Sequence, residues 1–160
     1  MSAAPSQRGP AAVLLIVRLA AGGLFVAAAS SKLNAPLDAF SRAILSYELV
    51  TPMWAGLAAI FLPWVELAAG LCVLLGWWGR GGAIVLSAFM VLFTFVKASA
   101  MVRGLSIPEC GCFGSLLAWL DPSGWRGVAV NMVWLGLCIV LVIGDVGPWS
   151  LERFVGHRVR

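Results

Sequence analysis

The chain has 160 residues, of which 61% are hydrophobic and 11% charged, with a formal net charge of +4 and a mean hydropathy of +0.97. About a quarter of the residues in a soluble domain are charged. This composition excludes a water-soluble globular protein, because too few charges are present to cover a water-facing surface.

Four apolar runs, residues 11–30, 53–78, 81–102 and 125–143, predict four membrane spans. Each is close to the ~20 residues that a helix needs to cross a hydrocarbon core. Backbone groups inside lipid must be satisfied within the protein, so the runs should be helices. We therefore expect an all-α, four-helix membrane bundle that forms a single domain over residues 1–160.

The first run also has features of a cleaved signal peptide. Arg8 precedes it, and the small residues 27–30 resemble a cleavage site. However, Arg18 interrupts its apolar region, and the run is longer than the apolar part of a typical signal peptide. We expect it to be retained as a membrane helix.

Between the first two spans, residues 37–45 predict a short amphipathic helix that lies at the membrane interface over the mouth of the bundle. Asn34 is a candidate N-cap, and Pro36 suits the first turn. A plain ordered loop is the alternative. The next link, residues 78–82, is a short glycine-rich turn, which makes the second and third spans antiparallel neighbours.

The link between the third and fourth spans carries a dithiol, Cys110-Gly111-Cys112. Two thiols one residue apart can close a small ring, and Gly111 allows the tight backbone that the ring needs. A strained disulfide is more easily reduced, which favours thiol exchange over permanent cross-linking. The preceding Lys97 and Arg103 are expected to favour the reactive thiolate. A structural disulfide, inert thiols and metal ligands remain alternatives.

Metal binding has little support in the sequence. Zinc prefers four ligands, and the single histidine, His157, is in the C-terminal tail. Copper(I) accepts soft sulfur ligands, and Met53 and Met101 are near the same outer end, so copper remains a minority hypothesis. We otherwise predict no metal site. The other cysteines, Cys72 and Cys138, are expected to be small packing residues, with an electron relay as the alternative.

Ionisable residues inside spans indicate a functional or structural polar site, because charge is costly in lipid. Counted from the outer ends of their spans, Arg18 and Glu66 lie within one helical turn in depth. We therefore predict an Arg18–Glu66 ion pair facing the bundle interior. It is either structural or part of a site for a quinone or substrate head group. Lys97 and Asn131 are candidates to extend this polar cluster outward.

Lys and Arg are slightly more frequent at the ends of the spans nearest the two termini, mainly because of the basic residues 153–160. We expect this chain to lie in the inner or plasma membrane of the cell. By the positive-inside rule, both termini are expected on the cytoplasmic side. This orientation places the dithiol outside the cytoplasm, where disulfides persist.

Five short motifs occur in order along the chain: Arg18-Leu19, Ser31-Lys32-Leu33, Pro63-x-x-Glu66, Arg103-Gly104 and Cys110-Gly111-Cys112-Phe113-Gly114. In this order they resemble the MauE family, part of the DoxX-like group of four-span membrane proteins. The resemblance covers nearly the whole chain, and its specific part is the last motif, between the third and fourth spans.

The resemblance implies a role in thiol-disulfide chemistry outside the cytoplasm. MauE proteins are associated with methylamine utilisation and are thought to help form the disulfides of the methylamine dehydrogenase small subunit, often with thioredoxin-like partners. On this resemblance, Cys110 and Cys112 match the family's cysteine pair. The family's polar positions are matched by Arg18, Lys32 and Glu66.

Three functions remain open from the sequence. The first is a thiol-disulfide oxidoreductase that exchanges disulfides through Cys110 and Cys112, with a membrane quinone as one candidate cofactor. The others are a non-enzymatic assembly factor and a transporter of a small solute or copper. The expected partners are membrane lipid and an extracytoplasmic thioredoxin-like or client protein, not nucleic acid. The supporting polar residues are Arg18, Lys32, Glu66, Lys97 and Arg103.

Overall fold

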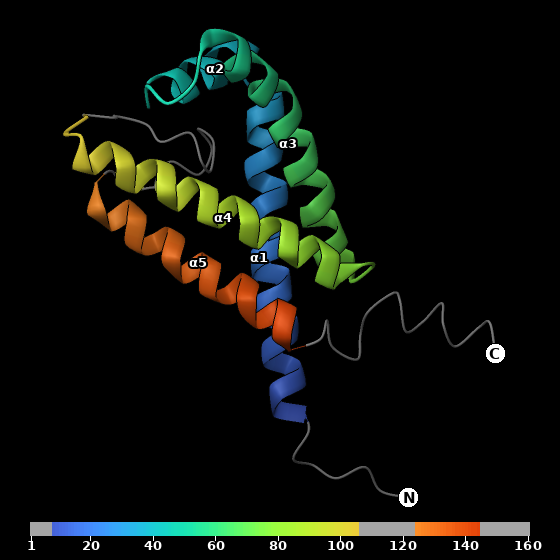
Figure 1. Ribbon diagram of the computed structural model, residues 1–160. Helices are drawn as coiled ribbons and strands as arrows, with labels where there is room; N and C mark the ends of the chain where they lie inside the picture. Colours follow the sequence, from blue (N-terminus) through green and yellow to red (C-terminus); the bar gives the residue numbers. More distant parts are fainter. Residues whose placement is uncertain (1–7, 106–123, 145–160) are drawn as a thin grey trace, which may run out of the picture.

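The computed structural model describes residues 8–105 and 124–144, and these form five α-helices (Figure 1). In chain order they are α1 (Arg8–Asn34), α2 (Leu37–Leu45), α3 (Pro52–Leu75), α4 (Gly79–Val102) and α5 (Trp125–Ile143). Four of them, all except α2, are long and apolar enough to cross a membrane. The predicted all-α, four-span architecture and the short helix between the first two spans are confirmed.

Several helix ends differ by a few residues from the sequence prediction, and two of them have a clear local cause. Helix α1 continues to Asn34, whose side-chain amide donates to the Ser30 carbonyl at 2.8 Å, so Asn34 closes α1 and does not cap α2. Pro36 occupies the N-cap position of α2 instead. Helix α3 ends at Leu75, because Gly76 adopts the left-handed conformation (φ 69°) that commonly terminates helices.

The long helices form two antiparallel pairs. Helix α1 packs along α3, and α4 packs along α5, while a tight turn joins α3 to α4 (Figure 1). The pairs meet near the α3–α4 turn and separate toward α2. We call the end that contains the α3–α4 turn the closed end. We call the end that contains α2, where α1 and α4 finish and α3 and α5 begin, the open end.

Glycines allow the helices to approach closely toward the closed end. A Cβ atom at Gly22 of α1 would lie 2.9 Å from the backbone nitrogen of Leu74 in α3. At Gly82 of α4, a Cβ atom would lie 2.7 Å from the backbone oxygen of Ala69. Small residues at such contacts are typical of membrane helices, whose association depends on close backbone packing.

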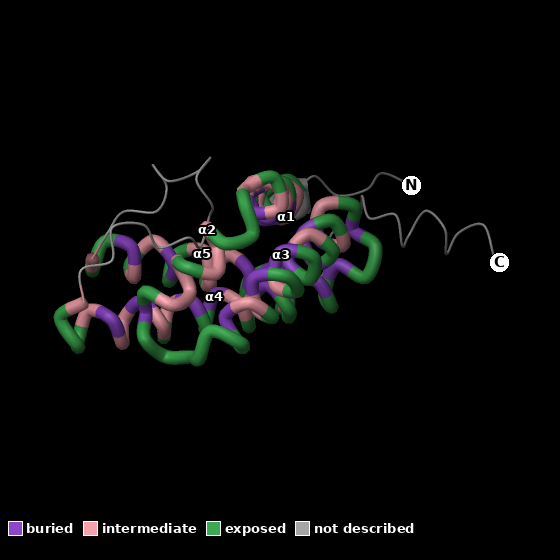
Figure 2. The backbone as a smooth tube through the Cα atoms, turned by 90° about the horizontal axis from the view of Figure 1, so that it is seen from above, coloured by how far each residue is buried: buried purple, intermediate pink, exposed green. Residues whose placement is uncertain are grey.

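Large apolar side chains remain exposed along the outer faces of all four long helices, and Figure 2 shows exposed positions around the periphery of the molecule. Apolar surface on this scale is costly in water but suited to lipid. Together with the four candidate spans, it identifies a multi-pass membrane protein. The exposed tryptophans include Trp54, Trp77, Trp78 and Trp125.

Candidate functional site

A buried ion pair joins α1 to α3 in the open half of the molecule. The Lys32 ammonium donates a hydrogen bond to Glu66 Oε2 at 2.6 Å. Both side chains are 2% exposed, so the ion pair is almost completely buried inside the protein. The second carboxylate oxygen, Glu66 Oε1, is buried with no hydrogen-bond partner. A buried polar atom without a partner is uncommon, and this oxygen could accept a further hydrogen bond.

Two aromatic rings cover the ammonium group of this pair. Lys32 Nζ lies 5.3 Å from the ring centroid of Phe40 in α2 and 5.3 Å from that of Phe93 in α4. Both distances are within the range of cation–π attraction. Because Glu66 belongs to α3, Lys32 connects four helices through one charged group.

The predicted Arg18–Glu66 ion pair is wrong, because Glu66 pairs with Lys32. Gly22 lies against Leu74, and Gly70 lies against Val26. This antiparallel register places Glu66 near residue 30 of α1 and Arg18 near residue 78, at the closed end. Arg18 is buried there, about 21 Å along α1 from Lys32 at 1.5 Å per residue.

The reason for the error is the length of α3. Counting depth from the outer ends assumed that the end of the first span and Pro52 are level. In the structure, α3 extends well beyond the end of α1, and its outer part packs against α2 instead. The expected polar centre therefore exists, but its cation comes from one end of α1 and not from the middle.

Two further buried polar residues lie on the α4–α5 pair. Lys97 is 6% exposed and one helical turn from Phe93, on the side toward the end of α4. Asn131 of α5 is fully buried, and neither its amide nitrogen nor its amide oxygen has a hydrogen-bond partner. Met101 and Gly124 are neighbours across α4 and α5, so this register brings Lys97 and Asn131 to similar depths. Both residues are thus buried and polar, as a polar cluster requires.

The dithiol, Cys110 and Cys112, lies outside the described residues, as does His157. The helices on either side of its link are described: α4 ends at Val102 and α5 begins at Trp125, both at the open end (Figure 1). Just after α4, the Arg103 guanidinium donates a hydrogen bond to the Tyr47 carbonyl, which connects the end of α4 to the segment that follows α2.

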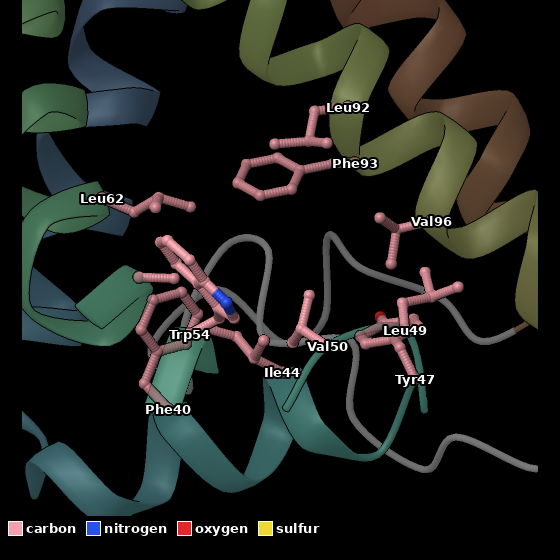
Figure 3. Close-up of a pocket in the computed structure, with 11 residues that line it drawn as sticks. Phe40, Ile44, Tyr47, Leu49, Val50, Trp54, Leu62, Leu92, Phe93 and Val96 are labelled. Carbon is pink, nitrogen blue, oxygen red and sulfur yellow. The ribbon is translucent and has the colours of Figure 1, made fainter. Parts of the chain in front are cut away.

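An apolar pocket of about 180 Å³ opens beside the ion pair, between α2, α3, α4 and the link before α3 (Figure 3). Phe40 and Phe93, which cover the Lys32 ammonium, also form part of the pocket wall. The buried ammonium therefore contacts two of the rings that line the pocket. Its other lining residues include Ile44, Tyr47, Trp54, Ala58, Leu62 and Val96.

Cys72 and Cys138 are free thiols. Cys138 is fully buried in the apolar core, and the Cβ of Cys72 would lie 3.0 Å from a Cβ placed at Gly82. Both positions agree with the prediction that these cysteines are packing residues. Within residues 8–105 and 124–144, no three His, Cys, Asp or Glu side chains gather in a way that could hold a metal ion.

The sequence did not predict that Lys32, two aromatic rings and a pocket come together in one site. Of these features, only Lys32 could be recognised in the sequence, because it is a charged residue directly after an apolar run. Phe40 and Phe93 gave no signal, since aromatic residues are common in membrane helices and only the tertiary arrangement brings them to one cation. Chemically, the arrangement offers a buried, paired cation beside an apolar cavity.

Comparison with known proteins supports one family. The family described as methylamine utilisation protein MauE matches residues 10–144. The methylamine utilization protein MauE of Paracoccus denitrificans is 28% identical over 132 residues, which cover 82% of this chain and 69% of that protein. No solved structure matches the chain significantly. The match over most of the length, together with four membrane spans, shows that this chain belongs to the MauE family.

Proposed function

We propose that this chain is a membrane thiol-disulfide oxidoreductase that oxidises extracytoplasmic proteins through Cys110 and Cys112. The observation that carries the proposal is the position of the buried polar residues. Lys32, Glu66 and Lys97 lie in the half of the bundle whose end gives rise to the dithiol link. Membership of the MauE family supports a role in the maturation of methylamine dehydrogenase or a similar disulfide-rich client.

The exchange follows ordinary disulfide chemistry. A thiolate of the client attacks the Cys110–Cys112 disulfide, and a mixed disulfide forms while one cysteine of the pair leaves as a thiolate. The second client thiolate then attacks the mixed disulfide, which releases the oxidised client and leaves Cys110 and Cys112 as a dithiol. Two electrons pass from the client to this chain, and the client thiols lose their two protons.

We test this mechanism by trapping. Cys110→Ser and Cys112→Ser each leave one thiol without its resolving partner, so one of the two variants should accumulate a mixed disulfide with the client or a thioredoxin-like protein. The complex is detected on a non-reducing gel and identified by mass spectrometry. Cys72→Ser and Cys138→Ser are matched controls, because they remove thiols that the structure places among the packed helices.

The redox state of client proteins in cells distinguishes this function from the alternatives. Loss of either Cys110 or Cys112 should leave client thiols reduced, as measured by alkylation. Clients that remain fully oxidised in both variants contradict the proposal. A transporter would instead tolerate loss of both cysteines and fail when Glu66 is replaced.

The orientation is part of the proposal. The open end, which gives rise to the dithiol link, faces the outside of the cytoplasm. A membrane-impermeant maleimide should label the reduced pair in intact cells. Labelling only after the cells are lysed contradicts this orientation.

A further inference from the structure

We propose that the apolar pocket between α2, α3 and α4 binds the ring of a lipid-soluble quinone, which accepts the electrons of the dithiol. The choice of a quinone rests on the proposed function, because an oxidised client leaves two electrons on Cys110 and Cys112 that need an acceptor. All residues that line the pocket belong to the described part of the chain.

The pocket has the size and lining for one apolar ring. Its volume is about 180 Å³, and an apolar protein cavity of ~150 Å³ is large enough to hold benzene. The inner wall includes Phe93, which is almost buried, and the aromatic ring of Phe40. Flat aromatic walls suit a flat ligand, because rings pack favourably in offset or edge-to-face contact.

The outer rim of the pocket lies at the exposed surface of the protein. Leu49, Val50 and Trp54 line it and are each more than 40% exposed (Figure 3). In a membrane protein, this rim is in contact with lipid or its interface. A quinone ring can therefore enter from the bilayer while its isoprenoid tail stays in the lipid, without passing through water.

A positive charge close to two rings of the wall favours a quinone over an acyl chain. The Lys32 ammonium lies 5.3 Å from the ring centroids of Phe40 and Phe93, which both line the pocket, and it pairs with Glu66 of α3, which does not line it. Of the two charges, the ammonium is therefore the one that contacts rings of the pocket wall, and a nearby positive charge favours electron-rich carbonyl oxygens and the negative charge of a quinone that has gained electrons. Trp54, which also lines the pocket, carries an indole N–H donor. A saturated alkyl chain carries no polar or charged group that this positive charge would attract.

The redox step balances. The dithiol loses two electrons and two protons and forms an S–S bond, while the quinone gains two electrons and two protons and becomes the hydroquinone. The products are the Cys110–Cys112 disulfide and one hydroquinone, which returns to the bilayer. No metal or further oxidant is needed.

Photolabelling of the full chain in phosphatidylcholine nanodiscs tests the pocket. An azido-benzoquinone with a decyl tail is the probe. We expect saturable labelling, with the label in peptides from α2, α3 or α4 that line the pocket. Ala58→Trp fills the pocket from α3 and should reduce labelling at least tenfold. Ala68→Trp is the matched control, because it makes the same substitution at an exposed position of the same helix, and should label normally.

Competition identifies the occupant. Excess decyl-benzoquinone should displace the probe, whereas decanol, which has the chain but no ring, should not. Equal displacement by decanol shows an acyl-chain site and overturns the proposal, as does equal labelling of the Ala58→Trp and Ala68→Trp variants.

The same labelling is repeated with the Cys110→Ser/Cys112→Ser double variant, which should still be labelled. This separates the two proposals. If the trapping experiment fails but labelling is specific to the pocket, the thiol function is wrong and the quinone site stands. If trapping succeeds but labelling is not specific, the quinone site is wrong and the thiol function stands.

Discussion

The closed and open ends of this protein are built by different principles. At the closed end, glycines let the helix backbones touch, as at Gly22 against Leu74 and Gly82 against Ala69. At the open end, the helix pairs separate, and this end contains a buried ion pair, two aromatic rings against its ammonium and a pocket. Close packing holds the helices together at the closed end. The open end can therefore carry polar and aromatic groups that do not maximise packing.

The largest expected effect comes from separating the charges at the open end. Lys32→Met leaves the Glu66 carboxylate buried without its partner, and Glu66→Met does the same to the ammonium. Breaking a buried pair in this way costs about 3–5 kcal/mol. We expect each single variant to be strongly destabilised in detergent unfolding experiments.

The Lys32→Met/Glu66→Met double variant sharpens this prediction. Replacing a buried ion pair by apolar groups of similar size is often close to neutral, so the double variant should recover most of the stability lost in either single variant. If the two single effects simply add, the pair is not energetically coupled and this description of the open end is wrong.

At the closed end, the corresponding test is Gly82→Ala. The added methyl group would meet the Ala69 carbonyl at 2.7 Å, so α3 and α4 must move apart. Such overpacking typically costs about 1–3 kcal/mol. Gly81→Ala is the matched control, since no atom lies within 4 Å of its added Cβ. Thermal unfolding should show a lower midpoint for Gly82→Ala only, and equal midpoints contradict the proposed close contact.

A smaller effect is expected from the rings that cover Lys32. Phe93→Leu keeps an apolar side chain but removes one aromatic face from the ammonium. A desolvated cation–π contact contributes up to about 2 kcal/mol. Phe95→Leu, at an exposed position of the same helix, is the control. In the Lys32→Met/Glu66→Met background the additional effect of Phe93→Leu should shrink; an unchanged effect indicates a packing role for the ring instead.

The smallest effect is expected for the exposed ion pair of α2. Asp38 and Arg42 are paired one turn apart, with side chains more than 60% exposed. Surface pairs of this kind contribute ~0–1 kcal/mol. Arg42→Met should therefore leave the unfolding midpoint almost unchanged, in contrast to Lys32→Met. A loss as large as that of Lys32→Met shows that exposure does not distinguish the two pairs.

The sequence predicted the fold well because hydrophobic length alone determines the spans. Residues 125–143 were placed at their observed ends, and the errors elsewhere were a few residues at helix termini. Gly76 marks such an end through its left-handed backbone, which a simple count of apolar residues does not detect.

The site was predicted only in part. Glu66 and Lys97 are buried as expected for a polar centre, but the partner of Glu66 is Lys32 and not Arg18. The choice between these cations depends on how far α3 extends past α1. The part of α3 beyond α1 packs against α2, and the periodicity of the sequence does not reveal this tertiary arrangement. For the same reason, the pocket between three helices has no signature in any one segment.

The most direct test of the difference between the two ends is the rate of client disulfide formation per molecule of folded protein, measured in cells by alkylation. We compare the Lys32→Met/Glu66→Met double variant at the open end with Gly82→Ala at the closed end. The double variant should be present at near-normal levels but oxidise clients at least tenfold more slowly, while Gly82→Ala should be less abundant with a normal rate per molecule. A double variant that oxidises clients at the wild-type rate contradicts a functional role for the buried pair.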